Sequence, residues 1–426
     1  MIIRPLDVRQ FDEAKAVAEV QSVAFRSPGG YRAVLDEIKK AEAEQRLLQG
    51  PEGKKPVAIP WGAFLDDTLI AVVYAIDFKM RFEGQVVNMC GIAGVGTRPE
   101  YRRQGAIRKI MQAIFEDTPH KNQIFSYLYP FSFAYYHQFG YDFGCRRIKA
   151  DIPFGELRQF APSGQVRLAD RLDQPVIEKI YNQFIEHTNG ALVREGTRWS
   201  MLLDKNPYLD QRYTYIWADD HGSEKGYMVY EKKTDPAFPN PGDEIFHVLD
   251  WAVTDTEALK GLLSFIRRFD SQFRLLEMRF PVHMPVESLF NEVDPVQRTL
   301  QTAGQIRVLN IRQAMLMLKL PSWLPELTCK IAVSDVFLPD NSGLYQVNLS
   351  HTGNHVFFKP QDISPGTKAD LHISAEALAS LLLGSRDLNE LTTVSEAELS
   401  QELSDQQKNL ILAFFRSKPA CIYDYF

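Results

Sequence analysis

The sequence has little cysteine, with four residues in 426: Cys90, Cys145, Cys329 and Cys421. They are widely spaced and form no CxxC pair, which excludes a disulfide framework and the usual ligand spacing of a zinc site. We therefore expect four buried thiols, no bound metal and a cytoplasmic location, where thiols stay reduced.

Long hydrophobic runs and a basic excess are also absent. No stretch approaches the roughly 20 apolar residues of a membrane span, and the first five residues do not open a signal peptide. The formal net charge is -6 and the isoelectric point is about 5.9, which argues against nucleic acid or an anionic membrane as the main partner. A cationic small molecule suits this charge better.

The length and the composition indicate several folded domains. A chain of 426 residues is too long for one ordinary core, and 45% hydrophobic with 24% charged residues is typical of globular proteins. The order of expected elements divides the chain into residues 1–150, 151–304 and 305–426. Each part mixes strands with helices, so the predicted fold class is α/β (α+β).

The first part is expected to follow the order β-α-α-β-β-β-α-β-α-β. Alternating apolar residues and turn signals predict strands, and apolar residues at helical spacing predict helices. The expected strands with ranges are 2–5, 61–65, 69–80, 85–95 and 123–129, and the helices are 12–25, 33–47, 103–116 and 133–138.

The second part repeats this order and the third does not. Strands are expected at 166–169, 213–218, 226–232, 245–253 and 275–280, with helices at 176–186 and 256–269. The turn between 253 and 256 lacks arginine and glycine, so it is not expected to hold a phosphate. The third part has expected strands at 329–336, 345–350, 355–359 and 368–373 and helices at 375–383 and 405–415.

The segment from Cys90 to Arg108 carries the clearest chemistry. A strand is followed by an arginine-rich turn and by the start of a helix, whose free N–H groups and partial positive charge bind anions. Gly105 lets the backbone approach a ligand, and Arg102, Arg103 and Arg108 can donate hydrogen bonds to phosphate oxygens. A pyrophosphate is the expected guest, although a bare RRxG is more often only a solvated helix start.

The segment R-R-Q-G-A resembles the acetyl-CoA signature of the GCN5-related N-acetyltransferase (GNAT) superfamily. A second segment, from Tyr129 to Tyr141, resembles the fifth strand of that superfamily and the tyrosine-bearing helix after it. The whole chain is similar to the Eis (enhanced intracellular survival) type of acetyltransferase. This resemblance implies two tandem GNAT-like mixed-sheet domains, the second degenerate, followed by a sterol-carrier-protein-2-like α/β domain.

The resemblance also implies a set of donor-binding residues and a quaternary state. Acetyl-CoA is expected as the co-substrate, and a homo-oligomer, a trimer or a hexamer, is expected as the assembly. The implied acetyl-CoA contacts are Val95, Gly96, Thr97, Arg102, Arg103, Gln104, Gly105, Ala106, Ile107, Arg108, Phe131 and Ser132.

Two catalytic residues follow from the same resemblance. Tyr136, three residues before Phe139, matches the general acid that protonates the departing thiolate, with Tyr135 as its competitor. The α-carboxylate of Phe426 matches the general base. Free α-carboxyls are weak bases, so this role predicts a desolvated, docked terminus. From the residues alone, Tyr136 could equally be a core aromatic and Phe426 the surface end of a last strand.

Three functions remain open at this stage. The first is acetyl transfer from acetyl-CoA to an amine of a cationic small molecule, aminoglycoside-like or a polyamine, by direct attack. The sequence has no GxSxG elbow and no convincing Cys/His pair, so it does not indicate a covalent enzyme intermediate. The second is an apolar-ligand-binding protein with a non-catalytic front. The third is a transferase of the same fold that uses an aminoacyl or fatty acyl donor.

Overall fold

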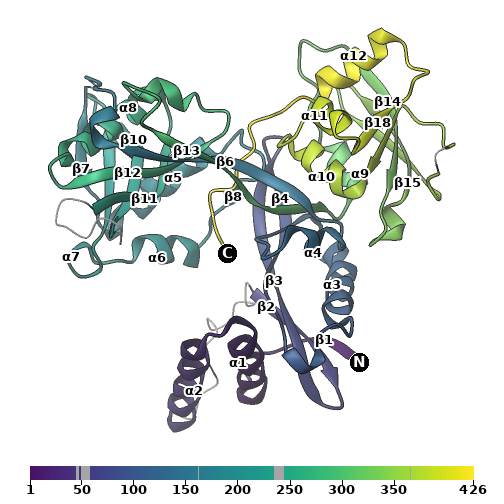
Figure 1. The fold of residues 1–426 in the computed structure, drawn as a ribbon, viewed down its shortest axis with the longest axis horizontal. Helices are drawn as coiled ribbons and strands as arrows, with labels where there is room; N and C mark the ends of the chain where they lie inside the picture. Colours follow the sequence, from purple (N-terminus) through teal and green to yellow (C-terminus); the bar gives the residue numbers. More distant parts are fainter. Residues whose placement is uncertain (45–47, 49–57, 162, 235–243, 365) are drawn as a thin grey trace.

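The protein forms three lobes that surround a long twisted sheet (Figure 1). The computed structural model describes residues 1–44, 48, 58–161, 163–234, 244–364 and 366–426. In Figure 1 the first lobe lies at the bottom, the second at the left and the third at the upper right.

The first lobe contains the arginine-rich turn. Its elements are β1 (Ile2–Pro5), α1 (Phe11–Phe25), α2 (Pro28–Ala43), β2 (Ala58–Leu65), β3 (Thr68–Phe82), β4 (Gln85–Thr97), α3 (Ala106–Asp117), β5 (Gln123–Leu128), α4 (Phe133–His137) and β6 (Asp142–Pro153). On α3, Ile107, Ile110, Met111 and Ile114 recur at helical spacing and are all buried. This apolar stripe packs α3 against the sheet and so fixes where the preceding turn lies.

The second lobe repeats the strand and helix order. Its elements are β7 (Gln165–Leu168), α5 (Gln174–Phe184), β8 (Leu192–Val193), α6 (Thr197–Leu203), α7 (Pro207–Asp210), β9 (Arg212–Ala218), β10 (Glu224–Lys233), β11 (Glu244–Val253), α8 (Thr256–Ile266), β12 (Phe273–Pro281) and β13 (Gln297–Val308). At the start of α8, the Asp255 carboxylate accepts a hydrogen bond from the Ala258 N–H at 2.8 Å. A carboxylate thus occupies the helix end where the first lobe offers arginines.

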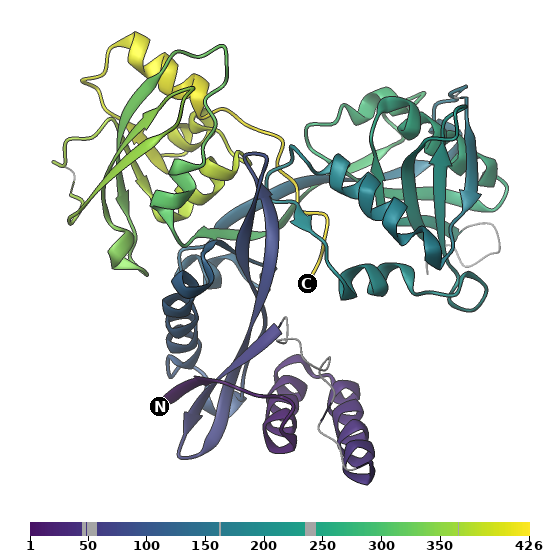
Figure 2. The same cartoon turned by 180° about the vertical axis from the view of Figure 1, so that it is seen from behind.

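The third lobe has its own sheet. It consists of α9 (Ile311–Leu316), β14 (Leu327–Ser334), β15 (Gly343–Leu349), β16 (His355–Pro360), β17 (Leu371–Ser374), α10 (Ala375–Leu383), α11 (Leu388–Thr393), β18 (Ala397–Leu399) and α12 (Asp405–Phe414). The strand order is β16-β15-β14-β17-β18. After α12 the chain leaves this lobe and runs back to the centre, as Figure 2 shows from behind.

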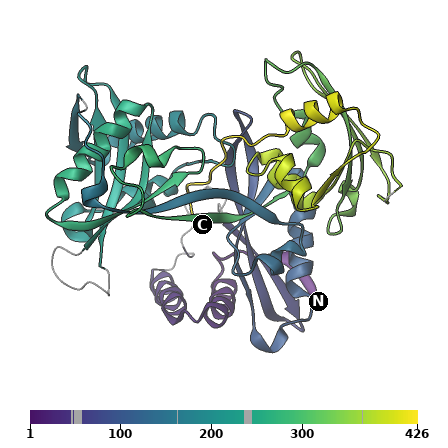
Figure 3. The ribbon, with the colours of Figure 1, turned by 45° about the horizontal axis from the view of Figure 1, so that its top comes forward.

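The first two lobes share one sheet. Thirteen of the described strands form it, in the order β1-β2-β3-β4-β5-β13-β6-β12-β11-β10-β9-β7, with β8 pairing β3. The strands β6 and β13 cross from one lobe to the other (Figure 3), and β13 pairs with both β5 and β6. The predicted boundaries after residues 150 and 304 therefore fall within strands, and the division of the chain there stays a prediction.

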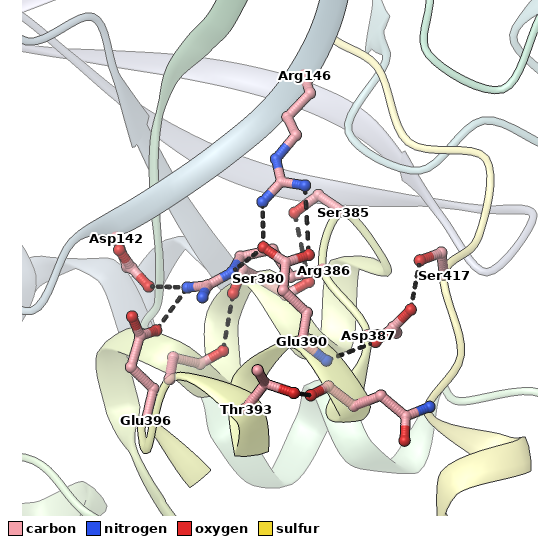
Figure 4. Close-up of polar contacts among 12 residues, drawn as sticks. Asp142, Arg146, Ser380, Ser385, Arg386, Asp387, Glu390, Thr393, Glu396 and Ser417 are labelled. Carbon is pink, nitrogen blue, oxygen red and sulfur yellow. Dashed lines mark hydrogen bonds and ion pairs between the residues drawn. The ribbon is translucent and has the colours of Figure 1, made fainter.

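An ionic cluster attaches the third lobe to β6 (Figure 4). The Arg386 side chain, 4% exposed, donates to Asp142 of β6 at 3.2 Å and to Glu390 of α11 at 3.0 Å. Arg146 of β6 also donates to Glu390, at 3.2 Å through Nη1. Beside this cluster, α10 is buried on almost every side, with Leu378, Leu381 and Leu382 fully enclosed. The third lobe is thus fixed to the shared sheet.

Two predicted helices differ from the observed ones. The helix expected at 103–116 begins at Ala106, because Arg103 and Gly105 take left-handed backbone angles, with φ of 63° and 76°, and form a turn first. The helix expected at 33–47 is observed from Pro28 to Ala43, and residues 45–47 lie outside the described part of the chain. Strand β13 was not expected at all.

Candidate active site

A cavity of about 780 Å³ opens where the arginine-rich turn meets the end of β4. It is lined by Val95, Gly96 and Thr97 of β4, by the turn and helix start from Arg102 to Arg108, and by Phe131, Tyr135, Gln138 and Phe139 around α4. Eleven of the twelve predicted acetyl-CoA contacts therefore face one cavity. The exception is Ser132, whose hydroxyl accepts a hydrogen bond from the Tyr135 N–H at 3.3 Å and caps α4.

The backbone of this cavity provides free hydrogen-bond donors. The first intrahelical bond of α3 runs from the Lys109 N–H to the Gly105 carbonyl. The N–H groups of the three preceding residues therefore have no partner within the helix. At Gly94 and Val95 the pairing of β4 with β3 skips a residue and forms a bulge, with Gly94 at φ 54°. Bulges re-aim the local backbone, here at the N–H groups beside the predicted acetyl-CoA contacts Val95 to Thr97.

The charge of the cavity is positive. Arg102 and Arg103 are exposed, and within the described part of the chain neither makes an ion pair. Arg108 lies over the rings of Phe337 and Phe139, at 5.2 and 5.7 Å from guanidinium carbon to ring centroid. Unpaired guanidinium groups beside a free helix N-terminus form a binding site for phosphate groups.

Helix α1 contributes residues that the sequence did not indicate. Phe25 is 55% exposed and lines this cavity with Ala24, and the Gln21 amide donates to the Gly94 carbonyl at 2.6 Å. Phe25 also lines a second cavity of about 550 Å³ between α1 and α2, where Glu37 and Tyr74 lie. No local motif marks these residues, because they reach the site only through the packing of α1 on the sheet.

Tyr136 lies behind the donor cavity and not in its lining. The residue is 3% exposed, and its ring centroid lies 5.1 Å from that of Tyr135 and 5.5 Å from that of Phe131. Burial, and then the neighbouring Tyr135, raise the pKa of Tyr136 above its ordinary value of 10. Its hydroxyl makes no hydrogen bond to another described residue, whereas the ring of Tyr135 lines the cavity.

Phe426 is docked in the centre of the molecule. Its ring lies 4.6 Å from that of Phe78 on β3 and 5.5 Å from that of Tyr129, which follows β5. The tail before it is buried at Ala420, Cys421 and Ile422. Figure 3 shows the C-terminus between the lobes. The terminus is thus packed against the first lobe.

Tyr136 and Phe426 lie on opposite faces of β5. Successive side chains of a strand point to opposite sides. Leu128 belongs to the same apolar cluster as Tyr136, whereas the ring of Tyr127 lies 6.5 Å from the ring of Phe426. The pairing of β4 with β5 ends at Ile92 and Leu128, after which the strands separate. The gap left there lies between the face of the sheet that carries Tyr136 and the face that carries Phe426.

Family comparisons agree with this geometry. Residues 7–144 and residues 190–308 each match the acetyltransferase (GNAT) domain, and residues 313–422 match the sterol carrier protein domain. The chain is a GNAT N-acetyltransferase that carries a C-terminal sterol carrier protein domain. As such it uses acetyl-CoA as its co-substrate and acts on amines.

Known proteins resemble this acetyltransferase over most of its length. An uncharacterized N-acetyltransferase of Streptomyces avermitilis is 23% identical over 297 residues, which cover 67% of this chain and 71% of that protein. A GCN5-related N-acetyltransferase of Anabaena variabilis has a TM-score of 0.81 at 19% identity, with all of both chains covered. Eis1 of Mycobacterium abscessus has a TM-score of 0.76 at 17% identity, also over all of both chains.

Three further findings concern metal ions, membrane spans and the cysteines. In the described part of the acetyltransferase, no three His, Cys, Asp or Glu side chains are grouped so that they could hold a metal ion. Likewise, none of its described helices combines the length and apolarity needed to cross a membrane. All four cysteines are free and buried, and burial raises the pKa of the Cys90 and Cys421 thiols to about 12.

Proposed function

We propose that the acetyltransferase transfers the acetyl group of acetyl-CoA to an amine of a cationic small molecule, aminoglycoside-like or a polyamine. The twelve residues predicted to contact acetyl-CoA would hold the donor, Tyr136 would act as general acid, and the Phe426 carboxylate as general base. The observation that carries this proposal is the packing of Tyr136 and Phe426 on opposite faces of β5, where β4 and β5 separate.

The donor would lie with its phosphates on the turn and its thioester in the gap. Arg102, Arg103 and the free N–H groups at the start of α3 would bind the pyrophosphate. The aromatic rings of Phe25 and Phe131, both exposed, would cover the apolar part of the donor. The N–H groups near Val95 would donate hydrogen bonds to the carbonyl oxygen as it becomes negative.

The reaction would be a direct attack. The acceptor nitrogen forms a bond to the thioester carbonyl carbon, and the Phe426 carboxylate takes the proton that this nitrogen loses, directly or through a water. The carbon–sulfur bond then breaks, and the thiolate of CoA receives the phenolic proton of Tyr136. Burial raises the Tyr136 pKa, which keeps the phenol protonated before the step and also makes it a weaker acid. Its hydrogen bond to the sulfur therefore contributes to the stabilisation of the thiolate, and solvent restores the proton that it gives up.

The acceptor is expected on the face of β3 that carries Tyr74 and Phe78. These residues are four apart and therefore point to the same side of the strand. Tyr74 lines the cavity between α1 and α2, and Phe78 packs against Phe426. The base and the second cavity thus share one face of the sheet, and Glu37 together with the net charge of -6 favours a cation there.

The apolar-ligand alternative has less support. It rests on the sterol-carrier-like third lobe, where the helix at 375–383 has an apolar face of Leu378, Leu381 and Leu382. Those side chains are enclosed by the shared core of the first and third lobes and are 0–2% exposed. This apolar helix face is therefore used for packing within the protein. A homo-oligomer and a cytoplasmic location stay predictions.

A thiol-release assay with acetyl-CoA tests the proposal. Polyamines and aminoglycosides would be compared with neutral amines of similar size and with amino acids, whose carboxylate adds a negative charge. We expect CoA release with the cationic amines and a lower KM for them. Faster turnover of the neutral or anionic amines would overturn the cationic acceptor, and no release with any amine would overturn the acetyl transfer.

A further inference from the structure

A buried ionic cluster holds the C-terminal tail two residues before its end. Arg194, whose side chain is 4% exposed, donates from Nε to the Asp424 carboxylate at 2.9 Å. Its two terminal nitrogens donate to both oxygens of Asp250, at 2.7 and 2.9 Å. The Tyr181 hydroxyl, with its single proton, lies 2.9 Å from the Leu192 carbonyl and 3.2 Å from the Asp424 carboxylate, and Tyr227 donates to Asp250 at 2.6 Å.

The charges of this cluster balance only when Asp424 is present. Arg198 lies 3.5 Å from Asp424, so two guanidinium groups face two carboxylates. Burial alone would lower the pKa of Arg194, but Asp250 and Asp424 outweigh it and the pKa is raised. A buried charge that loses one partner is strongly unfavourable. The cluster therefore favours a tail that stays docked.

Most of the cluster belongs to the second lobe. Tyr181 lies on α5, Tyr227 on β10 and Asp250 on β11, and Arg194 directly follows β8. Among these residues only Asp424 comes from the tail. The lobe that lacks the arginine-rich turn thus supplies the surroundings of the tail carboxylate.

The same cluster is tied to the strand that receives Phe426. Strand β8 pairs with β3, and Val193 of β8 lies opposite Lys79 of β3. Arg194 directly follows Val193, and Phe78 directly precedes Lys79. From the first lobe, the Tyr129 hydroxyl donates to the backbone carbonyl of Asp424. Asp424 is therefore held by its side chain from the second lobe and by its backbone from the first. Tyr425, in contrast, is 76% exposed.

We infer that Arg194, Asp250 and Asp424 are positioning residues for the terminal carboxylate, and that the second acetyltransferase-like lobe serves as the dock for the chain's own C-terminus. This inference rests on the proposed role of the Phe426 carboxylate. The cluster acts on the reaction only through the tail, because it fixes where the last two residues begin. The second lobe then has a role in catalysis without binding a donor of its own.

The decisive variant is Asp424→Asn, which keeps the shape of the side chain and removes its charge. We expect kcat to fall by about 100-fold, as misplacement of a catalytic group by about 1 Å does, with the KM for acetyl-CoA unchanged. Carboxypeptidase should release Phe426 faster from the variant. Asp173→Asn is the matched control: Asp173 also accepts two 2.7 Å bonds from one arginine, Arg167, which lies on the far edge strand β7.

Two milder variants cover the case in which Asp424→Asn folds poorly. Tyr181→Phe removes the hydroxyl shared between Asp424 and the Leu192 carbonyl and keeps the ring under Arg194, so a smaller fall in kcat is expected. Arg194→Lys keeps the positive charge but cannot make all three hydrogen bonds of Arg194 to Asp250 and Asp424. Combined with Asp424→Asn it should add little, because residues that act through one cluster are not additive.

The outcomes separate the inference from the proposed function. If Asp424→Asn and Tyr181→Phe keep wild-type kcat while Phe426 is released faster, the positioning role is wrong. If residues appended after Phe426 leave turnover intact, the carboxylate is not the base and the proposed mechanism itself fails. Loss of turnover in the extended protein together with full activity of Asp424→Asn would overturn the positioning role alone.

Discussion

The ring of Phe426 lies 4.6 Å from the ring of Phe78, at an interplanar angle of 57°. The last residue of the chain is therefore packed against β3 of the first lobe, although it follows the third lobe in sequence. Such aromatic pairs contribute about 0.5–1.5 kcal/mol beyond the area that they bury. The C-terminus is thus part of the first lobe's structure, and its position is open to direct tests.

Appending residues after Phe426 should abolish turnover. An added peptide bond converts the α-carboxylate into an amide, which cannot accept the proton of the acceptor amine. Binding of acetyl-CoA, measured by calorimetry, should stay unchanged, because the donor cavity is lined by other residues. An extension of equal length before Met1 is the control, since Figure 1 places the N-terminus at the outer end of the first lobe. Full activity of the C-terminally extended protein would remove the carboxylate from the mechanism.

Gly91 should tolerate no side chain. A Cβ atom there would lie 2.4 Å from the Phe78 ring and 3.0 Å from the Phe426 ring. Gly91→Ala must therefore displace one ring or both, at a cost of about 1–3 kcal/mol, which is typical of overpacking. We expect a lower kcat and a lower melting temperature. Gly155→Ala, at a position with open space around its Cβ, should change neither. Wild-type kcat in Gly91→Ala would contradict this prediction and would show either that the Phe78 ring alone is displaced or that the position of Phe426 is not critical.

Replacement of the two adjacent tyrosines should distinguish the general acid from a wall of the cavity. Tyr136→Phe removes a hydroxyl that has no hydrogen-bond partner among the described residues, so the fold should be unaffected. We expect a fall in kcat of about 100-fold, typical of the loss of a general acid. Tyr135→Phe keeps the ring that lines the donor cavity and should have little effect on kcat. The reverse result would assign the acid to Tyr135.

The sequence indicated the residues that line the cavity at the arginine-rich turn better than it indicated their surroundings. The segment from Val95 to Arg108 is contiguous, and its glycine and arginines act through local backbone geometry, so a motif could describe it. Phe25 and the pair of Arg194 with Asp424 have no such signal. Tertiary packing alone brings Phe25 to the cavity, and tertiary packing alone brings Arg194 to Asp424. Strand β13 was missed for the same reason: it pairs with β5 and β6 from far along the chain.

The stability of the second lobe should fall with acidification through His247. Burial lowers the pKa of His247 below 6.5, and the positive charges of Arg279 and Lys233 lower it further. The carboxylates of Glu277 and Glu231 raise the pKa, but they do not outweigh these effects. Between that lowered pKa and 6.5 the unfolded chain binds a proton that the folded chain does not. The free energy of unfolding therefore rises with pH there, and the contribution of His247 is complete above 6.5.

His247→Gln should weaken this dependence. Urea unfolding at about pH 7.5 and about pH 5.5 would measure it, on either side of the usual histidine pKa. We expect the wild type to lose more stability than the variant when the pH is lowered between these values. His221→Gln, at an exposed turn before β10, is the control and should behave like the wild type. A larger loss in His247→Gln than in the wild type would show that protonation of His247 stabilises the fold, against the direction of its lowered pKa.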